Sequence, residues 1–557
     1  MLLSRRFLLA AALLAAFSYH DVLAARKTVC TITVNSADER EAFRRYLPAD
    51  QYDFVELVER GRPDWLASAC RQQVRCDVLL ISGHFDGGDE FYSDRVDARE
   101  SLPVAEMERA SCSDSCPGVF SQLQEVYLFG CNTLNAEALR SASGEVARSL
   151  VRAGYSQADA MRLSQILGER HAESNRDRMR QIFKDVPVIY GFSSKAPLGR
   201  AAGPVLEQYL QSGGAAEIAS GQPSAHLLSL FAPVSMTVVA GLTDGDVQAS
   251  HRRDVCQFAD DRLAPEQKLR FVHRLLQRDA AEVRMFLDRL EQYATTLDAT
   301  LRHSEAVAKA LDEIAADRAA RDRYLAFMRD ADEQSVQARM IALAEHLGWL
   351  TPAEKHAELV GMLESRLAHG GAGSADVELV CTLNSAHALD GVLASMTVQS
   401  SWLADAGRAG VLACLGSPTA RERVLQAITS PSDADVEIAQ VYLRHRPLAD
   451  VDELRRVASG IARMRGTEAQ VRALDTLASH RLDDRQSLEA LTQLFPVTKS
   501  LDVQRAIAGI LIRADYHAFA KPELVRTLRQ HRLKSSTGQD LIDVLIRRLQ
   551  ADLAAAA

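Results

Sequence analysis

The chain has 557 residues, with 65 lysines and arginines against 74 aspartates and glutamates, which gives a formal net charge of -9. This acidic balance argues against a nucleic-acid-binding protein. Hydrophobic residues make up 47% of the chain, enough for a buried core, so a disordered or collagen-like chain is excluded. The low aromatic content of 6% favours helices over an all-β sandwich, and the length predicts about three domains.

The first 24 residues have the features of a secretory signal. Arg5 and Arg6 precede an apolar run over residues 7–17, and residues 22–24 end in the small side chains that a signal peptidase accepts. The run is shorter than the roughly 20 residues that cross a bilayer. We therefore predict cleavage after Ala24 and an exported protein, periplasmic or secreted, with no stable membrane span. The paired arginines leave the general and the twin-arginine export routes both open.

Export changes the interpretation of the nine cysteines. In an oxidising compartment most are expected to pair, and an odd number leaves at least one thiol free or intermolecular. Cys112 and Cys116 have the spacing of half a zinc site, but no second matched pair occurs, so disulfide bonding is favoured and we assign no metal and no cofactor. A redox role for these two residues ranks low because they lack the C-x-x-C spacing.

Strands and helices are predicted to alternate in an N-terminal domain over residues 25–245. The hydrophobic patterns predict strands over residues 28–34 and 52–58, and three further strands that begin near residues 76, 125 and 186. They predict helices over residues 37–47 and 64–73, and another helix from about Asn135. This order implies an α/β domain with a mostly parallel sheet and helices on both faces.

His84 and Cys131 each follow a predicted strand directly. In open α/β sheets the carboxyl ends of the strands are where ligands bind. A cysteine attacks a carbonyl as the thiolate, and a nearby imidazole can take the proton and later deliver it to the leaving amine. The backbone N–H groups of Phe85 and Cys131 are candidates for an oxyanion hole, and the helix expected after Asn132 would direct its positive end at Cys131.

At these residues the chain resembles the caspase-like clan of cysteine peptidases, clan CD, which includes caspases, metacaspases, gingipains, separases and CHAT domains. In that clan one hydrophobic strand ends in Ser-Gly-His-Gly or a close variant and a later strand ends in the catalytic Cys. The matches are Ile81-Ser82-Gly83-His84 and Leu128-Phe129-Gly130-Cys131-Asn132-Thr133, the second most like the CHAT and separase motifs. The resemblance covers roughly residues 28–210 and implies Cys131 as nucleophile and His84 as general base and acid.

The chain departs from the clan at two positions. Phe85 stands where the clan has a glycine after the His, and Gly130 stands where many metacaspases have an Asp before the Cys. The residue preferred before the scissile bond therefore stays open. Asp86, Asp89 and Asp94, in the loop after His84, are candidates for an acidic pocket that binds Arg or Lys side chains, with solvated loop charges as the alternative.

The second half of the chain is predicted to be all-helical. From Pro265 onwards apolar residues recur at helical spacing, and segments near Asp435, Ala469 and Asp502 recur at intervals of about 33 residues. They resemble degenerate HEAT repeats, which stack into a solenoid that commonly binds a protein. We assign residues 246–557 to this region, with a candidate division near residue 370. An irregular helical bundle is the alternative.

Together these features predict an exported Cys-His endopeptidase that acts on a protein or peptide substrate, with HEAT-like repeats for recognition or regulation. The alternative is a non-catalytic interaction scaffold with a degenerate caspase-like domain. A free Cys131 favours the peptidase, whereas a disulfide at Cys131 favours the scaffold.

Overall fold

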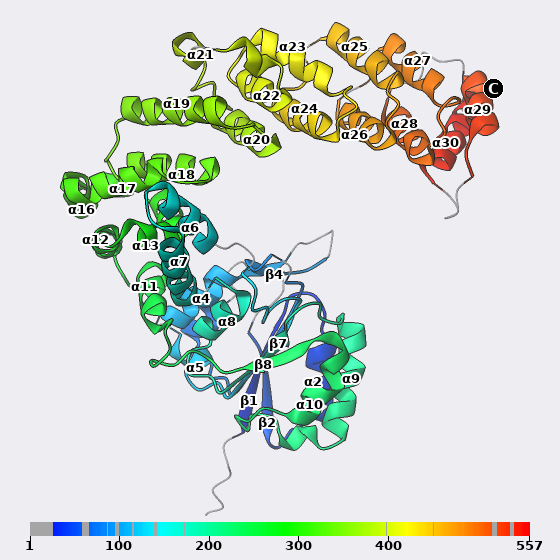
Figure 1. The fold of residues 1–557 in the computed structure, drawn as a ribbon. Helices are drawn as coiled ribbons and strands as arrows, with labels where there is room; N and C mark the ends of the chain where they lie inside the picture. The colour runs from blue at the N-terminus through cyan, green and yellow to red at the C-terminus, as the bar shows by residue number, and fades with distance from the viewer. Residues whose placement is uncertain are drawn as a thin grey trace, which may run out of the picture. The chain divides into compact units, whose positions relative to one another are not determined.

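The computed structural model divides into two compact units, the first ending at Asp332 and the second beginning at Glu333 (Figure 1). The sequence-based boundary at residue 245 falls inside the first unit, and the boundaries near residues 245 and 370 stay predictions. The signal segment lies outside the described residues. The structure describes residues 26–57, 66–85, 87–94, 100–113, 116–138, 142–171, 173–396, 398–448, 450–480, 482, 484–514, 521–534 and 540–556.

A six-stranded sheet forms the centre of the first unit, in the order β2-β1-β3-β6-β7-β8. The first five of these strands run parallel, and β8 pairs antiparallel with β7, so the predicted mostly parallel sheet is confirmed. Strands β3, β6 and β7 are buried along their whole length because helices cover both faces of the sheet. The strands are β1 (Lys27–Thr33), β2 (Tyr52–Glu56), β3 (Val78–Ser82), β6 (Glu125–Phe129), β7 (Val188–Phe192) and β8 (Met236–Val239).

Alternate residues of each strand supply the two cores on either side of the sheet. Val78 and Leu80 of β3 join the core beneath α2 (Asp38–Tyr46), α9 (Gly199–Gln211) and α10 (Ala225–Phe231). Leu79 and Ile81 of β3 join the core on the other face of the sheet, which four helices cover. Those helices are α3 (Ala67–Arg71), α4 (Val104–Cys112), α5 (Pro117–Phe120) and α8 (Asn175–Ile182).

A group of helices after the sheet also belongs to the first unit. It contacts α6 (Ala142–Arg152) and α7 (Gln157–His171), which connect β6 to β7. A buried ion pair joins Arg284 Nε to Glu145 Oε2 at 2.8 Å across one of these contacts. The helices are α11 (Ala249–Ala259), α12 (Pro265–Leu276), α13 (Ala280–Met285), α14 (Leu287–Thr296), α15 (Ala299–Arg302), α16 (Glu305–Ala316) and α17 (Arg318–Arg329).

The described part of the second unit is helical throughout. Helices α20, α22, α24, α26, α28 and α30 pack in succession as one row, and α25 packs on α27 in a second row (Figure 1). The three segments predicted to recur are the neighbouring helices α24, α26 and α28. The unit contains α18 (Gln334–His346), α19 (Pro352–His369), α20 (Ser374–Leu383), α21 (Val392–Ser395), α22 (Ala406–Cys414), α23 (Pro418–Ala427), α24 (Asp433–His445), α25 (Val451–Ala462), α26 (Thr467–Ala478), α27 (Arg485–Leu494), α28 (Leu501–Arg513), α29 (Lys521–His531) and α30 (Leu541–Ala556).

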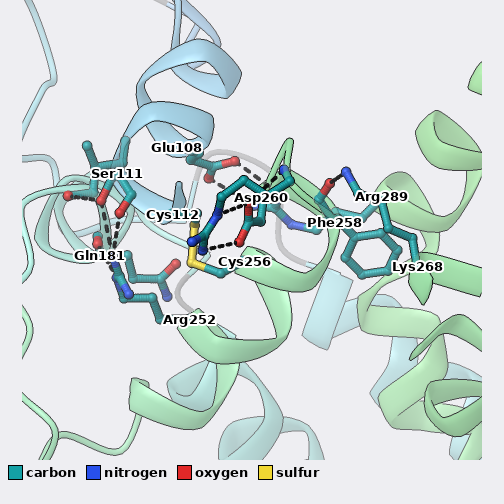
Figure 2. Close-up of a disulfide and its surroundings, with 12 residues drawn as sticks. Glu108, Ser111, Cys112, Gln181, Arg252, Cys256, Phe258, Asp260, Lys268 and Arg289 are labelled. Carbon is teal, nitrogen blue, oxygen red and sulfur yellow. Dashed lines mark hydrogen bonds and ion pairs between the residues drawn. A yellow bond between two sulfur atoms is a disulfide. The ribbon is translucent and has the colours of Figure 1, made fainter. Parts of the chain in front are cut away.

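Eight of the nine cysteines form disulfides, and Cys131 is free. Cys112 and Cys116 are both bonded, as expected, but to other cysteines and not to each other. Four disulfides indicate maturation in an oxidising compartment. Within the described residues, no helix has the length and apolar character of a membrane span. The pairs are Cys30–Cys76, Cys70–Cys116, Cys112–Cys256 (Figure 2) and Cys381–Cys414.

Candidate functional site

His84 and Cys131 line one pocket at the carboxyl edge of the sheet. Strands β3 and β6 are hydrogen-bonded neighbours, and their last residues, Ser82 and Phe129, are paired in register. Each candidate residue follows its strand by two positions, so parallel pairing brings them to the same edge. The pocket has a volume of about 40 Å³, and Asn35, just beyond the end of β1, also lines it. The structure thus brings together the two residues that the sequence singled out.

The His84 side chain is fixed from both its backbone and its ring. Its backbone exchanges two hydrogen bonds of 2.9 Å with Tyr92 of β4 (Glu90–Tyr92), and the two rings lie 5.4 Å apart. Asn35 Nδ2 lies 3.1 Å from His84 Nε2, and Asp94 Oδ2 lies 3.6 Å from the same nitrogen. Both polar contacts are at Nε2, and Nδ1 has no hydrogen-bond partner among the residues that the structure describes. An amide nitrogen donates and a carboxylate accepts, so the Asn35 contact favours the ring proton on Nδ1, whereas the Asp94 contact favours it on Nε2 and leaves Nδ1 able to accept a proton.

The Cys131 sulfur accepts a hydrogen bond from a backbone amide. Ala196 N–H, in the loop after β7, donates to Cys131 Sγ at an N···S distance of 3.3 Å. An N–H donor directed at the sulfur stabilises negative charge on it. The loop is held there because Asn132 N–H donates to Ser194 O at 2.6 Å.

The expected helix after Asn132 is absent, and this prediction was wrong. Residues 131–138 form turns, and the next helix, α6, begins at Ala142. Asn132 adopts a left-handed φ of 59°, a conformation that Asn tolerates better than most residues but that ends regular structure. Leu134 N–H then donates to Phe192 O at 3.0 Å, which holds this segment against β7. The backbone amide of Ala196, and not the N-terminus of a helix, therefore donates to the Cys131 sulfur.

Phe85 is part of the core behind the site. Its ring is fully buried and lies 4.6 Å from the ring of Phe91, and its backbone φ is not positive, so this position does not require glycine. Gly130 does require the absence of a side chain, because a Cβ there would lie 2.8 Å from Phe85 Cβ. The backbone N–H groups of Phe85 and Cys131 donate no hydrogen bond to described residues. Their role as oxyanion donors stays a prediction.

The three aspartates after His84 differ in their surroundings. Asp86 lies outside the described residues. Asp89 is exposed and lies 3.6 Å from an Arg178 guanidinium nitrogen, and Asp94 is exposed beside His84. Neither Asp89 nor Asp94 lines the pocket that contains Cys131.

Glu39 is a pocket residue that the sequence analysis missed. It lies in the first turn of α2, is 2% exposed and accepts a hydrogen bond of 3.1 Å from Ser82 Oγ. Burial raises its pKa to about 7. No arginine or lysine of the described residues pairs with it. Its helical spacing from Ala42 and Phe43, at three and four residues, is the signal that places it on the buried face of α2.

The chain matches no protein-family model, no curated protein and no solved structure. The caspase-like resemblance therefore rests on the motifs alone. Among the described residues, no group of three or more His, Cys, Asp or Glu side chains is arranged to hold a metal ion.

Proposed function

We propose that the first unit is a cysteine peptidase in which Cys131 is the nucleophile and His84 the general base and acid. One observation carries the proposal: the single free cysteine among nine lines the same pocket as His84, at the carboxyl edge of a parallel sheet. In an exported chain a thiol that escapes pairing and faces an imidazole in a pocket has the residues that acyl transfer needs.

The reaction follows from these groups. His84 takes the proton of Cys131, and the thiolate attacks the scissile carbonyl to form a C–S bond and an oxyanion. The oxyanion accepts hydrogen bonds from backbone N–H groups, for which Phe85 and Cys131 are the candidates. His84 then gives its proton to the leaving amine as the C–N bond breaks. Water hydrolyses the thioester, with His84 taking the proton of the water and returning it to the sulfur.

Two further contacts support this assignment by orienting the pair. With its proton on Nε2, toward the Asp94 carboxylate, His84 has an unprotonated Nδ1 that can accept a proton. The Ala196 amide holds the sulfur and stabilises its charge. An imidazole whose other nitrogen is fixed by a third group is the arrangement that general-base catalysis by His generally uses.

Glu39 supports a substrate with a positively charged side chain. Burial raises the pKa of Glu39 to about 7, and a cation that enters the pocket would favour its ionised form and gain an ion pair. We therefore propose cleavage after a basic residue, with the charged tip at Glu39.

The experiment is hydrolysis of fluorogenic peptides that differ only in the residue before the scissile bond. The mature protein should cleave the Lys and Arg peptides, and Cys131→Ser should abolish cleavage. His84→Ala should lower kcat about 10²- to 10⁴-fold, the usual contribution of a general base. His303→Ala, at an exposed histidine of the first unit outside the pocket, is the matched control. If no peptide or unfolded protein substrate is cleaved, the non-catalytic scaffold becomes the better account.

A further inference from the structure

A second and larger pocket lies elsewhere in the first unit, between α4, α11, α12, α14 and α15. Its volume is about 420 Å³, within the range of small-molecule sites. Phe258, Leu263, Leu297 and Leu301 supply apolar side chains to its wall. The pocket lies beside the Cys112–Cys256 disulfide, which fixes α4 to α11, and Figure 2 shows Phe258, Lys268 and Arg289 in this region. None of its residues takes part in the proposed peptidase site.

One charge in the wall of this pocket is already neutralised. Arg289 donates two hydrogen bonds, of 3.0 and 2.9 Å, to the two carboxylate oxygens of Glu108. This paired arrangement satisfies both groups and fixes the guanidinium against α4. Arg289 therefore contributes shape to the pocket but no net charge.

Lys268 is the second cation in the wall of this pocket. Its ammonium group donates to Phe258 O at 2.6 Å, a contact that caps the end of α11 and uses one of its three donors. No described carboxylate lies within ion-pair distance of it. Burial lowers the pKa of Lys268, and the nearby carboxylates Asp260 and Asp261 oppose that shift.

The two carboxylates nearest to Lys268 are held by other cations. Asp260 binds Arg262 with an N···O distance of 2.7 Å, and Asp261 binds Arg109 at 2.6 Å, a guanidinium that it shares with Glu106. The pocket thus combines an apolar wall with one ammonium group that forms no direct ion pair with the described residues. Counting the lining charges of Glu108, Lys268 and Arg289, the net charge is +1.

We infer that this pocket binds a small molecule with a single anionic head, such as a carboxylate, on an apolar body. The head would form the ion pair that Lys268 lacks, and the body would contact Phe258 and the leucines. A monoanion matches the single ammonium group that lacks a direct ion pair, whereas a phosphate monoester, with nearly two charges at neutral pH, exceeds it. This inference is independent of the proposed peptidase activity.

The test uses the full mature chain and three probes, 1-pyrenebutyrate, 4-phenylbutyrate and decanoate, each compared with its neutral alcohol. Binding is measured by isothermal titration calorimetry and by the shift in Tm. Lys268→Met removes the charge while keeping the apolar stem, Lys268→Arg keeps the charge, and Ala105→Trp fills the pocket from an exposed lining position. Arg270→Met removes an exposed cation from the same helix and serves as the control.

We expect at least one acid to bind with Kd below 1 mM, at least tenfold more tightly than its alcohol. Lys268→Met and Ala105→Trp should each weaken binding of that acid at least tenfold, whereas Lys268→Arg and Arg270→Met should leave it within about twofold. The inference is overturned if none of the acids binds, or if acid and alcohol bind equally. It is also overturned if Lys268→Met lowers Tm without changing affinity, because Lys268 would then be only a helix cap.

Discussion

Glu39 gives the candidate site a pH dependence whose direction can be stated. Its folded-state pKa of about 7 lies above the ordinary value of 4.5, so between these values the unfolded chain loses the proton and the folded chain keeps it. Stability therefore falls as pH rises from 4.5 to 7 and levels off above. Glu39→Gln should raise the free energy of unfolding at pH 8 by up to about 3 kcal/mol, from 1.36 kcal/mol per pKa unit. Urea denaturation at pH 5 and pH 8 measures this difference.

The same substitution should weaken selection of basic peptides. We expect Glu39→Gln to lower kcat/KM for Lys and Arg peptides by about 10- to 100-fold, the range for a lost hydrogen bond to a charged group, with little change for a norleucine peptide. Glu41→Gln, at an exposed position of the same helix, should change neither value. Unchanged selectivity in Glu39→Gln would remove Glu39 from the substrate pocket.

His171 and His251 form a second pH-dependent pair, buried between α7 and α11. Their rings lie 4.6 Å apart, and burial lowers the pKa of His171 to about 4 and that of His251 well below its ordinary value. Because the unfolded chain binds protons at about pH 6.5 and the folded chain does not, stability should fall as pH drops from 6.5 towards 4. The charged groups that face the pair are Arg170, Arg278 and Arg289, which oppose protonation, and Asp254, which favours it.

Replacing one imidazole isolates this effect. His251→Phe keeps an aromatic ring beside Phe286 and removes one titrating group. Its loss of unfolding free energy between pH 7 and pH 5 should be smaller than that of the unchanged chain, as measured by urea denaturation at each pH. Equal losses in the two proteins would show that the histidine pair does not cause acid sensitivity.

At the scale of elements, α13 is held on α6 by a buried ion pair. Arg284 and Glu145 are 8% and 4% exposed, and Glu145 also accepts a 2.6 Å hydrogen bond from Ser149. Arg284→Met would leave a buried carboxylate without its cation, and we expect a loss of about 3–5 kcal/mol in the free energy of unfolding. The double variant Arg284→Met/Glu145→Leu should recover most of that loss. A single variant that is as stable as the double would contradict this account of the contact.

The elements that the sequence predicted correctly are those with a strong local hydrophobic pattern. Strands β3 and β6 are unbroken apolar runs, and their order on adjacent parallel strands was enough to bring His84 and Cys131 to one edge. The helix expected after Asn132 failed because the hydrogen bonds of Asn132 and Leu134 to the chain near β7 are tertiary contacts that local propensity does not contain. The position of Glu39 in the pocket likewise depends on packing of α2 against the sheet.

At the scale of the whole molecule, the two units have separate disulfides. Cys381–Cys414 lies within the second unit, and the other three lie within the first. Removing Cys381–Cys414 with a double serine variant opens a loop of 33 residues, worth about 3–4 kcal/mol on the chain-entropy model. Calorimetry should show the unfolding transition of the second unit at a lower temperature and that of the first unit unchanged. If the Tm of both units fell by the same amount, the two units would unfold together in one cooperative transition.

The central claim is that His84 activates Cys131, and thiol labelling tests it most directly. The mature, non-reduced protein is treated with iodoacetamide from pH 5 to pH 9, and mass spectrometry locates the alkylated cysteine. The account predicts that Cys131 alone is labelled, that labelling persists at pH 6, where an ordinary thiol is almost fully protonated, and that it slows in His84→Ala. A Cys131 that is disulfide-bonded, or that labels at the same rate with and without His84, would contradict the proposed peptidase.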